Sequence, residues 1–415
     1  MVEKRIAIVG GGPSGIITLR SLLDEGFTSV TLFERKNKLG GCWNLTPPEQ
    51  INFEQLSKKQ WDVDPIPETI PTTVPHTTVQ RFMDTATYPY LETNVEDIAM
   101  EFDKPFPKDT ISKHGKDSPF RHFTEINQYL HDLADLKYVT FDTSVELIEK
   151  KNEQWRLVLR KFGQTQDYIY EEFFDNVVVA SGHFDVPFVP EIPGLQQFSE
   201  LDDTLVIHSK QFRSRDDFKN KQVVVVGASV SAMDSIRDIL PVAKRAITSQ
   251  KPTTEPHVYF GTEAFDHDGI EKRGQIVKIE DHTIHFHDGT STFADAIILG
   301  TGFLYHYPFL PKFPELKELI FDANDPSLAF VGHNTPGLTF KLFQWQAILV
   351  ARVFAGKGNV PTTIRNDPTI HPDFKQYYET LRDASCGALP EWNPAWEEAF
   401  YRGHLRRRQY WLDNP

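Results

Sequence analysis

The feature that most constrains the fold of this 415-residue chain is a glycine-rich turn directly after a short apolar run near the N-terminus. Residues 6–9 are all apolar, which is typical of a buried parallel strand. Gly10-Gly11-Gly12-Pro13-Ser14-Gly15 follows at once, a helical pattern extends to Leu23, and a second strand is expected over residues 29–33. This order of strand, turn, helix and strand predicts a βαβ unit, and with it an α/β fold.

The turn fits the GxGxxG pattern of dinucleotide-binding proteins. Glycine at positions 10, 12 and 15 permits a tight bend and close approach of the backbone to a pyrophosphate, which would sit at the helix N-terminus formed by Pro13 and Ser14. Glu34 ends the next strand, 24 residues after Gly10, where an acid can accept a hydrogen bond from a ribose hydroxyl. We therefore predict a dinucleotide site. The alternative is a glycine-rich turn in an unrelated α/β protein.

The next segment, Leu39-Gly40-Gly41-Cys42-Trp43, places small residues where backbone could pass close to a flavin. The alternative interpretation is a turn with a core tryptophan. The chain has only two cysteines, Cys42 and Cys386, and no CxxC, which excludes a disulfide framework and a redox-active dithiol and fits a reducing compartment. We expect Cys42 to be a small buried residue rather than a nucleophile.

A second unit of the same kind is predicted at Gly227-Ala228-Ser229-Val230-Ser231-Ala232, where small residues occupy every glycine position after an apolar strand. Lys251 lies 24 residues after Gly227, the offset that separates Glu34 from Gly10. A cation at this position suits the 2′-phosphate of NADPH, whereas an anion suits a 2′-hydroxyl. We therefore predict NADPH rather than NADH, with a solvated surface lysine as the alternative.

These units predict two Rossmann-like dinucleotide-binding domains. The FAD-binding domain is expected to be discontinuous, comprising residues 1–185 and 303–415, with an NADPH-binding domain of residues 186–302 inserted into it. Two further strands end in small residues beside the expected cofactors, at Ser181-Gly182 and Thr301-Gly302. The proline-rich residues 45–121 lack clear periodicity, and a structureless loop of that length is unusual within a domain, so we expect a folded cover.

Composition limits the partners. A formal net charge of −14 argues against nucleic acid or anionic lipid as the main partner. No stretch reaches the roughly 18 apolar residues of a membrane span, and the N-terminus is no signal peptide, so we expect a cytoplasmic protein, with peripheral association at the endoplasmic reticulum surface as an alternative. His282, His285 and His287 are expected to be solvated, and no metal is predicted. Arg406-Arg407-Arg408 could touch a membrane, although charge matched to a terminal helix dipole explains it equally.

Taken together, these motifs resemble the flavin-containing monooxygenases, the single-component class B flavoproteins, over nearly the whole chain, and suggest a soluble, fungal-like member. Gly40–Trp43 is similar to the family's GGxW, Leu91-Glu92-Thr93-Asn94 to its LxTN, and Ala180–His183 and Gly300–Phe303 to its two strand-end motifs. One signature departs from the pattern. Of the family's FxGxxxHxxx(F/Y), residues 208–212 keep the second half, but Phe198 precedes His208 by ten residues rather than six.

The resemblance implies that NADPH reduces FAD, that O2 adds to the reduced flavin as a C4a-hydroperoxide, and that a soft nitrogen or sulfur of a small molecule takes one oxygen atom. Asn94 matches the family's asparagine beside the flavin and becomes the predicted catalytic and cofactor-binding residue. Its alternative is a helix N-cap, with Asp97 three residues later. A Baeyer–Villiger enzyme, another FAD and NADPH oxidoreductase and a non-catalytic nucleotide-binding protein remain alternatives, and the oligomeric state is left open.

Overall fold

The computed structural model describes residues 4–59, 62–107, 112, 118–335 and 337–413. Its first sheet has seven strands, of which the central ones are parallel. In sheet order they are β19 (Leu316–Lys317), β20 (Phe321–Asp322), β21 (Leu328–Phe330), β8 (Asn176–Val179), β1 (Ile6–Val9), β2 (Val30–Phe33) and β4 (Val139–Thr140). The predicted βαβ unit is β1, α1 (Pro13–Asp24) and β2.

Strand β1 is buried on both faces, which explains its uninterrupted apolar sequence. Ile6 and Ile8 belong to the core that the helices form on one side of the sheet, and Ala7 and Val9 belong to a second core under an antiparallel sheet on the other side. The helices of the first side are α1, α4 (Phe123–Leu133), α7 (Thr339–Phe354) and α8 (Phe374–Ala384). The antiparallel sheet contains, in order, β3 (Thr72–Val74), β7 (Asp167–Phe174), β6 (Gln154–Lys161) and β5 (Thr143–Lys151).

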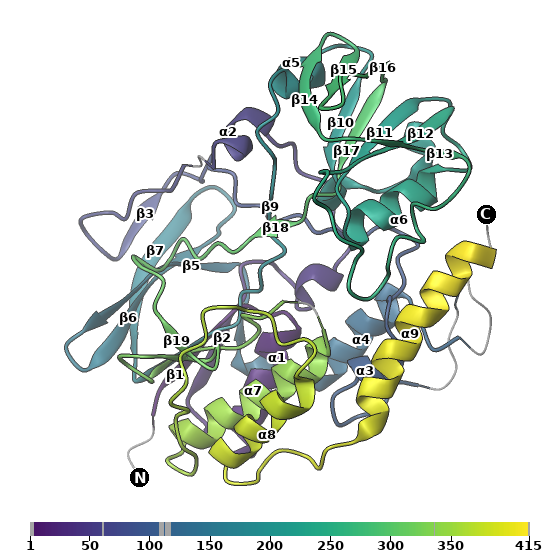
Figure 1. Ribbon diagram of the computed structural model, residues 1–415. Coiled ribbons are helices and arrows are strands. Elements are labelled where there is room, and N and C mark those ends of the chain that lie inside the picture. The colour runs from purple at the N-terminus through teal and green to yellow at the C-terminus, as the bar shows by residue number, and fades with distance from the viewer. Residues whose placement is uncertain (1–3, 60–61, 108–111, 113–117, 336, 414–415) are drawn as a thin grey trace.

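A second parallel sheet stands beside the first (Figure 1). Its order is β10 (Leu205–His208), β17 (Ala296–Leu299), β11 (Gln222–Val226), β12 (Arg245–Ser249) and β13 (Ile270–Arg273). Helix α6 (Val230–Ile239) follows β11, so the second predicted βαβ unit is also present. A small antiparallel sheet caps this half with β14 (Ile276–Glu280), β15 (Thr283–Phe286) and β16 (Ser291–Phe293). A turn at Asp288-Gly289 joins β15 and β16 into a hairpin.

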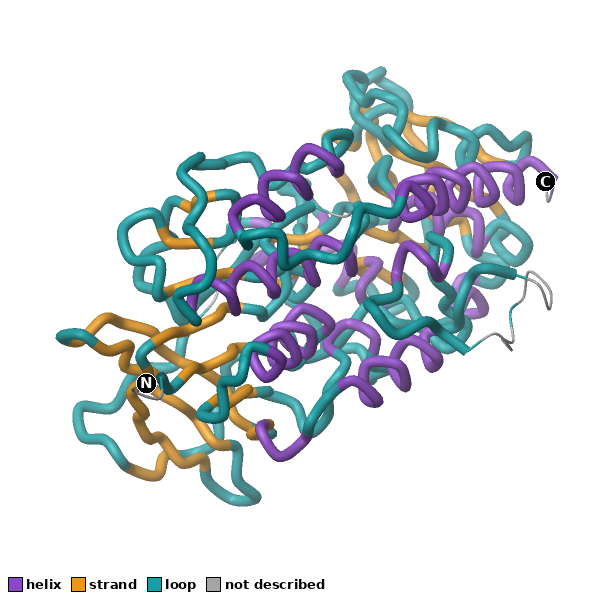
Figure 2. Tube along the Cα trace, turned by 90° about the horizontal axis from the view of Figure 1, so that it is seen from below, coloured by secondary structure: helices purple, strands orange, loops and turns teal. Residues whose placement is uncertain are grey.

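The chain passes between the two halves along a pair of short antiparallel strands, β9 (Val186–Pro187) and β18 (Phe303–Leu304). The remaining helices are α2 (Phe53–Ser57), α3 (Asp97–Met100), α5 (Leu195–Ser199) and α9 (Pro394–Asp413). Short 3-10 turns lie at η1 (Gly41–Trp43), η2 (Leu136–Tyr138), η3 (Ser209–Gln211) and η4 (Arg215–Phe218). In both views α9 runs from the helices of the first half toward the second half, where the chain ends (Figures 1 and 2).

Among the described residues, no helix combines the length and the apolar character that crossing a bilayer requires. The proline-rich segment is largely irregular, but β3 adds a strand to the antiparallel sheet and α3 packs against α7 and α9. The described part of this segment therefore lies on the folded body, as the sequence predicted.

Candidate active site

A cavity of about 860 Å³ lies where the two halves meet. Most of the residues predicted from sequence to hold cofactors line it. They are Gly10, Gly12, Pro13, Ser14, Glu34, Gly41, Cys42, Trp43, Asn94, Ser181, Gly182, Ser229, Ser231 and Gly302. Four predicted residues do not line it: Gly15, Gly227, Lys251 and Thr301. The cavity thus joins the carboxyl ends of both parallel sheets, where α/β proteins bind nucleotides.

The first glycine turn allows no side chain at two of its positions. Gly10 has a φ of 105°, and a Cβ there would lie 2.7 Å from the carbonyl oxygen of Ala180. A Cβ on Gly15 would lie only 1.9 Å from the carbonyl oxygen of Gly10, so Gly15 acts by packing rather than by lining. Helix α1 begins after Gly12 without a side-chain cap. Its first N–H groups therefore remain available for an anion such as a diphosphate.

Glu34 is fixed at the wall of the cavity. Its Oε2 accepts a hydrogen bond of 2.7 Å from the backbone N–H of Gly11, and its Oε1 accepts one of 2.8 Å from the N–H of Lys36. Burial raises the pKa of this carboxyl group. A carboxylate oxygen can accept more than one hydrogen bond, so both oxygens keep capacity for the hydroxyls of a ribose.

Gly41 and Cys42 form the opposite side of the turn. A Cβ on Gly41 would lie 2.9 Å from the Cα of Gly12, which explains why this approach needs glycine. The expectation that Cys42 is a buried filler is wrong, because the residue lines the cavity and is accessible to solvent. The surrounding protein still desolvates its thiol and raises the pKa to about 11, so it stays protonated at neutral pH.

The second turn repeats the first. Gly227 has a φ of 124°, and a Cβ there would lie 2.3 Å from the carbonyl oxygen of Gly300. Ser229 begins α6 without a side-chain cap, and Ser229, Val230 and Ser231 line the cavity. A second uncapped helix N-terminus therefore faces the same cavity as that of α1. Thr301 does not line the cavity, and its Oγ1 instead donates a 2.5 Å hydrogen bond to the carbonyl oxygen of Phe188.

The strand pairing places the residue equivalent to Glu34 one position earlier in the second unit than the sequence offset that singled out Lys251. The N–H of Gly10 donates to the carbonyl oxygen of Phe33, and Glu34 follows directly. In the second unit the N–H of Gly227 donates to the carbonyl oxygen of Ser249, so Gln250 occupies the position equivalent to Glu34. Lys251 is the next residue and is exposed.

Asn94 lies half-buried in the cavity wall, and its side-chain amide makes no hydrogen bond within the part of the chain that the structure describes. The helix-cap interpretation is wrong, because α3 begins after Glu96 and that residue provides no side-chain cap. Nearby, Ser181 Oγ, His183 Nδ1 and Asn334 Oδ1 are buried without a partner among the described residues. Buried polar atoms are normally paired. These residues line the cavity, so their free polar atoms fit a bound polar group such as a flavin ring or an amide.

Asn334 and His183 were not predicted. Asn334 follows β21 at the same carboxyl edge of the sheet as Gly182, so the rule that ligands meet strand ends could have found it. The loop that leads to Asn334 is held by Gln346, whose Oε1 accepts a 2.9 Å hydrogen bond from the N–H of Gly332. Burial lowers the pKa of His183 to about 4, so its imidazole is neutral.

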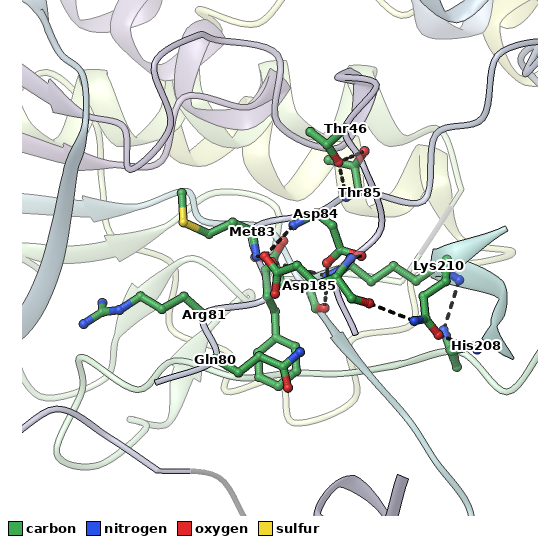
Figure 3. Close-up of polar contacts among 12 residues, drawn as sticks. Thr46, Gln80, Arg81, Met83, Asp84, Thr85, Asp185, His208 and Lys210 are labelled. Atoms are coloured by element: carbon green, nitrogen blue, oxygen red, sulfur yellow. Dashed lines mark hydrogen bonds and ion pairs between the residues drawn. The ribbon is translucent and has the colours of Figure 1, made fainter. Parts of the chain in front are cut away.

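Residues of the altered linker signature form a buried cluster of polar contacts with the proline-rich segment (Figure 3). Lys210 is 1% exposed, and its Nζ lies 2.6 Å from Asp84 Oδ1 and donates a 2.6 Å hydrogen bond to the carbonyl oxygen of Asp185. Burial lowers the pKa of His208 to about 3, and its Nδ1 accepts from the N–H of Lys210 at 3.1 Å. The retained half of the motif thus ties the linker to the proline-rich segment and to the cavity wall at Asp185.

Sequence and structure comparisons agree with this geometry. The model of the flavin-binding monooxygenase-like family matches residues 3–54 and 86–255, more than half of the chain. The chain belongs to this family. It is an FAD-containing, NADPH-dependent monooxygenase.

Relatives of this flavin monooxygenase include two Arabidopsis thaliana proteins. Flavin-containing monooxygenase FMO GS-OX-like 7 is 31% identical over 404 residues, covering 92% of this chain and 79% of the relative. Flavin-containing monooxygenase FMO GS-OX3 is 32% identical over 401 residues, with the same coverage of 92% and 79%.

Solved structures share the fold of the flavin monooxygenase. S-allyl-L-cysteine S-oxygenase from Allium sativum superposes with a TM-score of 0.76 at 24% identity, covering 99% of this chain and 94% of that structure. Tmm from Pelagibacter sp. strain HTCC7211 superposes with a TM-score of 0.72 at 21% identity, covering 99% and 91%. The predicted α/β fold with two Rossmann-like domains is confirmed.

Proposed function

We propose that this flavin monooxygenase transfers one oxygen atom of O2 to a soft nucleophilic nitrogen or sulfur of a small molecule. The observation that carries the proposal is the single cavity that two uncapped helix N-termini share. One N-terminus would hold the diphosphate of FAD and the other that of NADPH, so electrons could pass between cofactors within one shared cavity. FAD, when bound, supplies the electron transfer and the reaction with O2.

The chain's own residues bind, orient and enclose. We assign residues 1–185 and 303–415 to the FAD domain and residues 186–302 to the NADPH domain. Glu34 would accept from the FAD ribose, and the backbone N–H groups after Gly12 would hold the diphosphate. The amide of Asn94 and the free polar atoms of Ser181 and Asn334 would hydrogen-bond the ring system. The cover segment contributes Phe82 and Asn94 to the cavity wall, which limits the entry of water.

The test begins with the purified protein loaded with FAD and kept without oxygen. NADPH should bleach the flavin absorbance, and air with a methyl aryl sulfide, a tertiary amine or a ketone should then give a product carrying label from isotopically labelled O2. A sulfoxide or N-oxide supports the proposal, whereas an ester from the ketone points to the Baeyer–Villiger alternative. Release of hydrogen peroxide with no labelled product from any of them would contradict oxygen transfer.

Lys251 is proposed to contact the 2′-phosphate of NADPH from the loop after β12. Lys251→Ala should lower kcat/KM for NADPH about tenfold and leave NADH little changed, since one exposed charge contact is lost. Lys244→Ala is the matched control, because Lys244 is also exposed but precedes β12 at the opposite edge of the sheet. An NADPH/NADH preference that is the same in both variants would remove Lys251 from the site.

A further inference from the structure

The side chains that line the cavity divide by charge. All of its charged lining residues come from the first 185 positions: Glu34, Arg35, Lys36, Asp62, Asp64, Arg81, Glu146 and Asp185. Ion pairs link several of them, including Arg35 with Asp185 at 2.9 Å and Arg81 with Glu146 at 2.7 Å. This end of the cavity adjoins the first glycine turn and the antiparallel sheet, and it suits the charged and polar parts of a nucleotide.

The opposite part of the lining carries no Asp, Glu, Lys or Arg among the described residues. We call its most aromatic portion the charge-free wall, formed by His257, Val258, Tyr259, His371, Phe400 and His404. These residues come from a loop after β12, a loop before α8, and α9. Figure 1 shows α9 on the side of the molecule away from the antiparallel sheet, so the wall and the charged end lie apart.

Tyr259 is the centre of the wall. Its ring centroid lies 4.8 Å from that of His371, 5.0 Å from Phe400 and 4.7 Å from His404, with the first two in edge-to-face arrangement. Aromatic rings at these separations and angles attract one another and give a rigid surface. The Tyr259 hydroxyl makes no hydrogen bond within the described part of the chain, and Tyr259 lines the cavity.

The imidazoles of the wall are neutral near pH 7. Burial lowers the pKa of His404 to about 4, and its Nδ1 lies 2.6 Å from the carbonyl oxygen of Phe400, to which it donates. Burial also lowers the pKa of His257 and of His371. The wall therefore offers rings, an alkyl group and uncharged polar atoms, and none of its lining residues is a counter-ion; Asp373, Glu397 and Arg407 act on His371 and His404 from outside the lining.

We propose that the charge-free wall binds the oxygen-accepting substrate and selects an uncharged thioether; this inference rests on the proposed function. An anion or an ammonium group placed against Tyr259 and His404, away from the exposed Val258, would lose hydration without gaining an ion pair from the lining, which is unfavourable. Aromatic faces and edges contact thioether sulfur favourably. In the reaction the sulfur forms a bond to one oxygen atom, the other oxygen leaves as water, and NADPH with one proton supplies the two electrons and becomes NADP⁺.

Val258 allows a test by charge, because it lines the cavity but is 65% exposed, so a polar substitution should not disturb folding. Three thioethers of matched size would be compared: one neutral, one carrying a carboxylate and one carrying a quaternary ammonium group. The unaltered enzyme should prefer the neutral compound at least tenfold in kcat/KM. Val258→Lys should raise kcat/KM for the carboxylate compound about fivefold and lower it for the ammonium compound, and Val258→Glu should do the reverse, both effects shrinking in high salt.

Val277→Lys and Val277→Glu are the matched controls, since Val277 is also exposed at 43% but lies on β14, outside the cavity lining. Equal kcat/KM for the three thioethers, or Val258 variants that behave like the Val277 variants, would overturn the inference while oxygenation stands. So would oxygenation of amines without thioethers. Anaerobic reduction by NADPH, measured without any thioether, separates these outcomes from failure of the proposed function. If NADPH does not reduce the flavin, the proposed function fails, and the inference fails with it.

Discussion

Lys210 and Asp84 form an ion pair in which the side chains are 1% and 2% exposed. The two residues are far apart in the sequence, in the linker and in the proline-rich segment, and Figure 3 shows both beside Asp185, which lines the cavity. A buried pair of this kind contributes little net stability compared with an apolar pair, but loss of one partner leaves an uncompensated charge. Lys210 therefore holds the linker, the proline-rich segment and the cavity wall at Asp185 together, and it has no role in the chemistry.

Lys210→Met should lower the free energy of unfolding by about 3–5 kcal/mol, because Asp84 would stay buried without its cation. Denaturant titration measures the change. Lys219→Met, at an exposed position of the same linker, should change stability by less than about 0.5 kcal/mol. A second substitution, Asp84→Asn, should recover part of the loss in the Lys210→Met background. Additive losses in the double variant would show that the two residues do not act as a pair.

Helix α9 carries a basic face whose partners are acids on both halves of the molecule. Arg402 and Arg406 pair with Glu96 beside α3, at 2.6 Å and 3.1 Å, and Arg407 pairs with Asp234 on α6. The sequence left a membrane surface and a helix dipole as alternatives for this basic run. The ion pairs account for the basic run, and they connect α9 to both halves of the molecule.

The double variant Glu96→Gln, Asp234→Asn should loosen α9 and speed hydrogen exchange of residues 394–413, while exchange of β1 stays slow because that strand is fully buried. Hydrogen-exchange mass spectrometry measures both segments. Glu271→Gln, which removes a half-exposed partner of Arg245 instead, serves as the control and should leave α9 unchanged. Unaltered exchange of α9 in the double variant would show that these ion pairs do not hold α9 in place.

At the scale of the whole molecule, stability should depend on buried neutral histidines in both halves. Burial lowers the pKa of His183 and His404 to about 4 and that of His208 to about 3, against about 6.5 in an unfolded chain. As pH falls through about 6.5, the unfolded chain gains protons that the folded protein does not take up. The folded state therefore loses stability as the pH falls toward 4.

The melting temperature should accordingly fall between pH 7 and pH 5, as measured by calorimetry of the FAD-loaded protein. His404→Phe should flatten part of this slope, since it keeps a ring in place but removes one group that protonates on unfolding. His287→Phe is the comparison, because His287 is exposed, and this variant should change the slope less than His404→Phe does. A wild-type melting temperature that does not change over this range would contradict the assignment of neutral buried imidazoles.

The sequence by itself determined the two glycine turns, their strands and helices, and two dinucleotide sites, because each βαβ unit is complete within a short stretch of chain. At Gly10 and Gly227 the positive φ is a local requirement of the turn, whereas the lack of room for a Cβ comes from Ala180 and Gly300, which directly follow neighbouring strands. The strand-end residues Ser181 and Gly182 could be placed by the same reasoning.

Only the tertiary structure decided the remaining features. The equivalence of Gln250, rather than Lys251, to Glu34 depends on hydrogen bonds between strands, which a count along the chain cannot resolve to one residue. The accessibility of Cys42 depends on a cavity enclosed by both halves. The charge-free wall joins Tyr259 to His404, which the chain separates by more than a hundred residues, so only the packing of α9 brings them together.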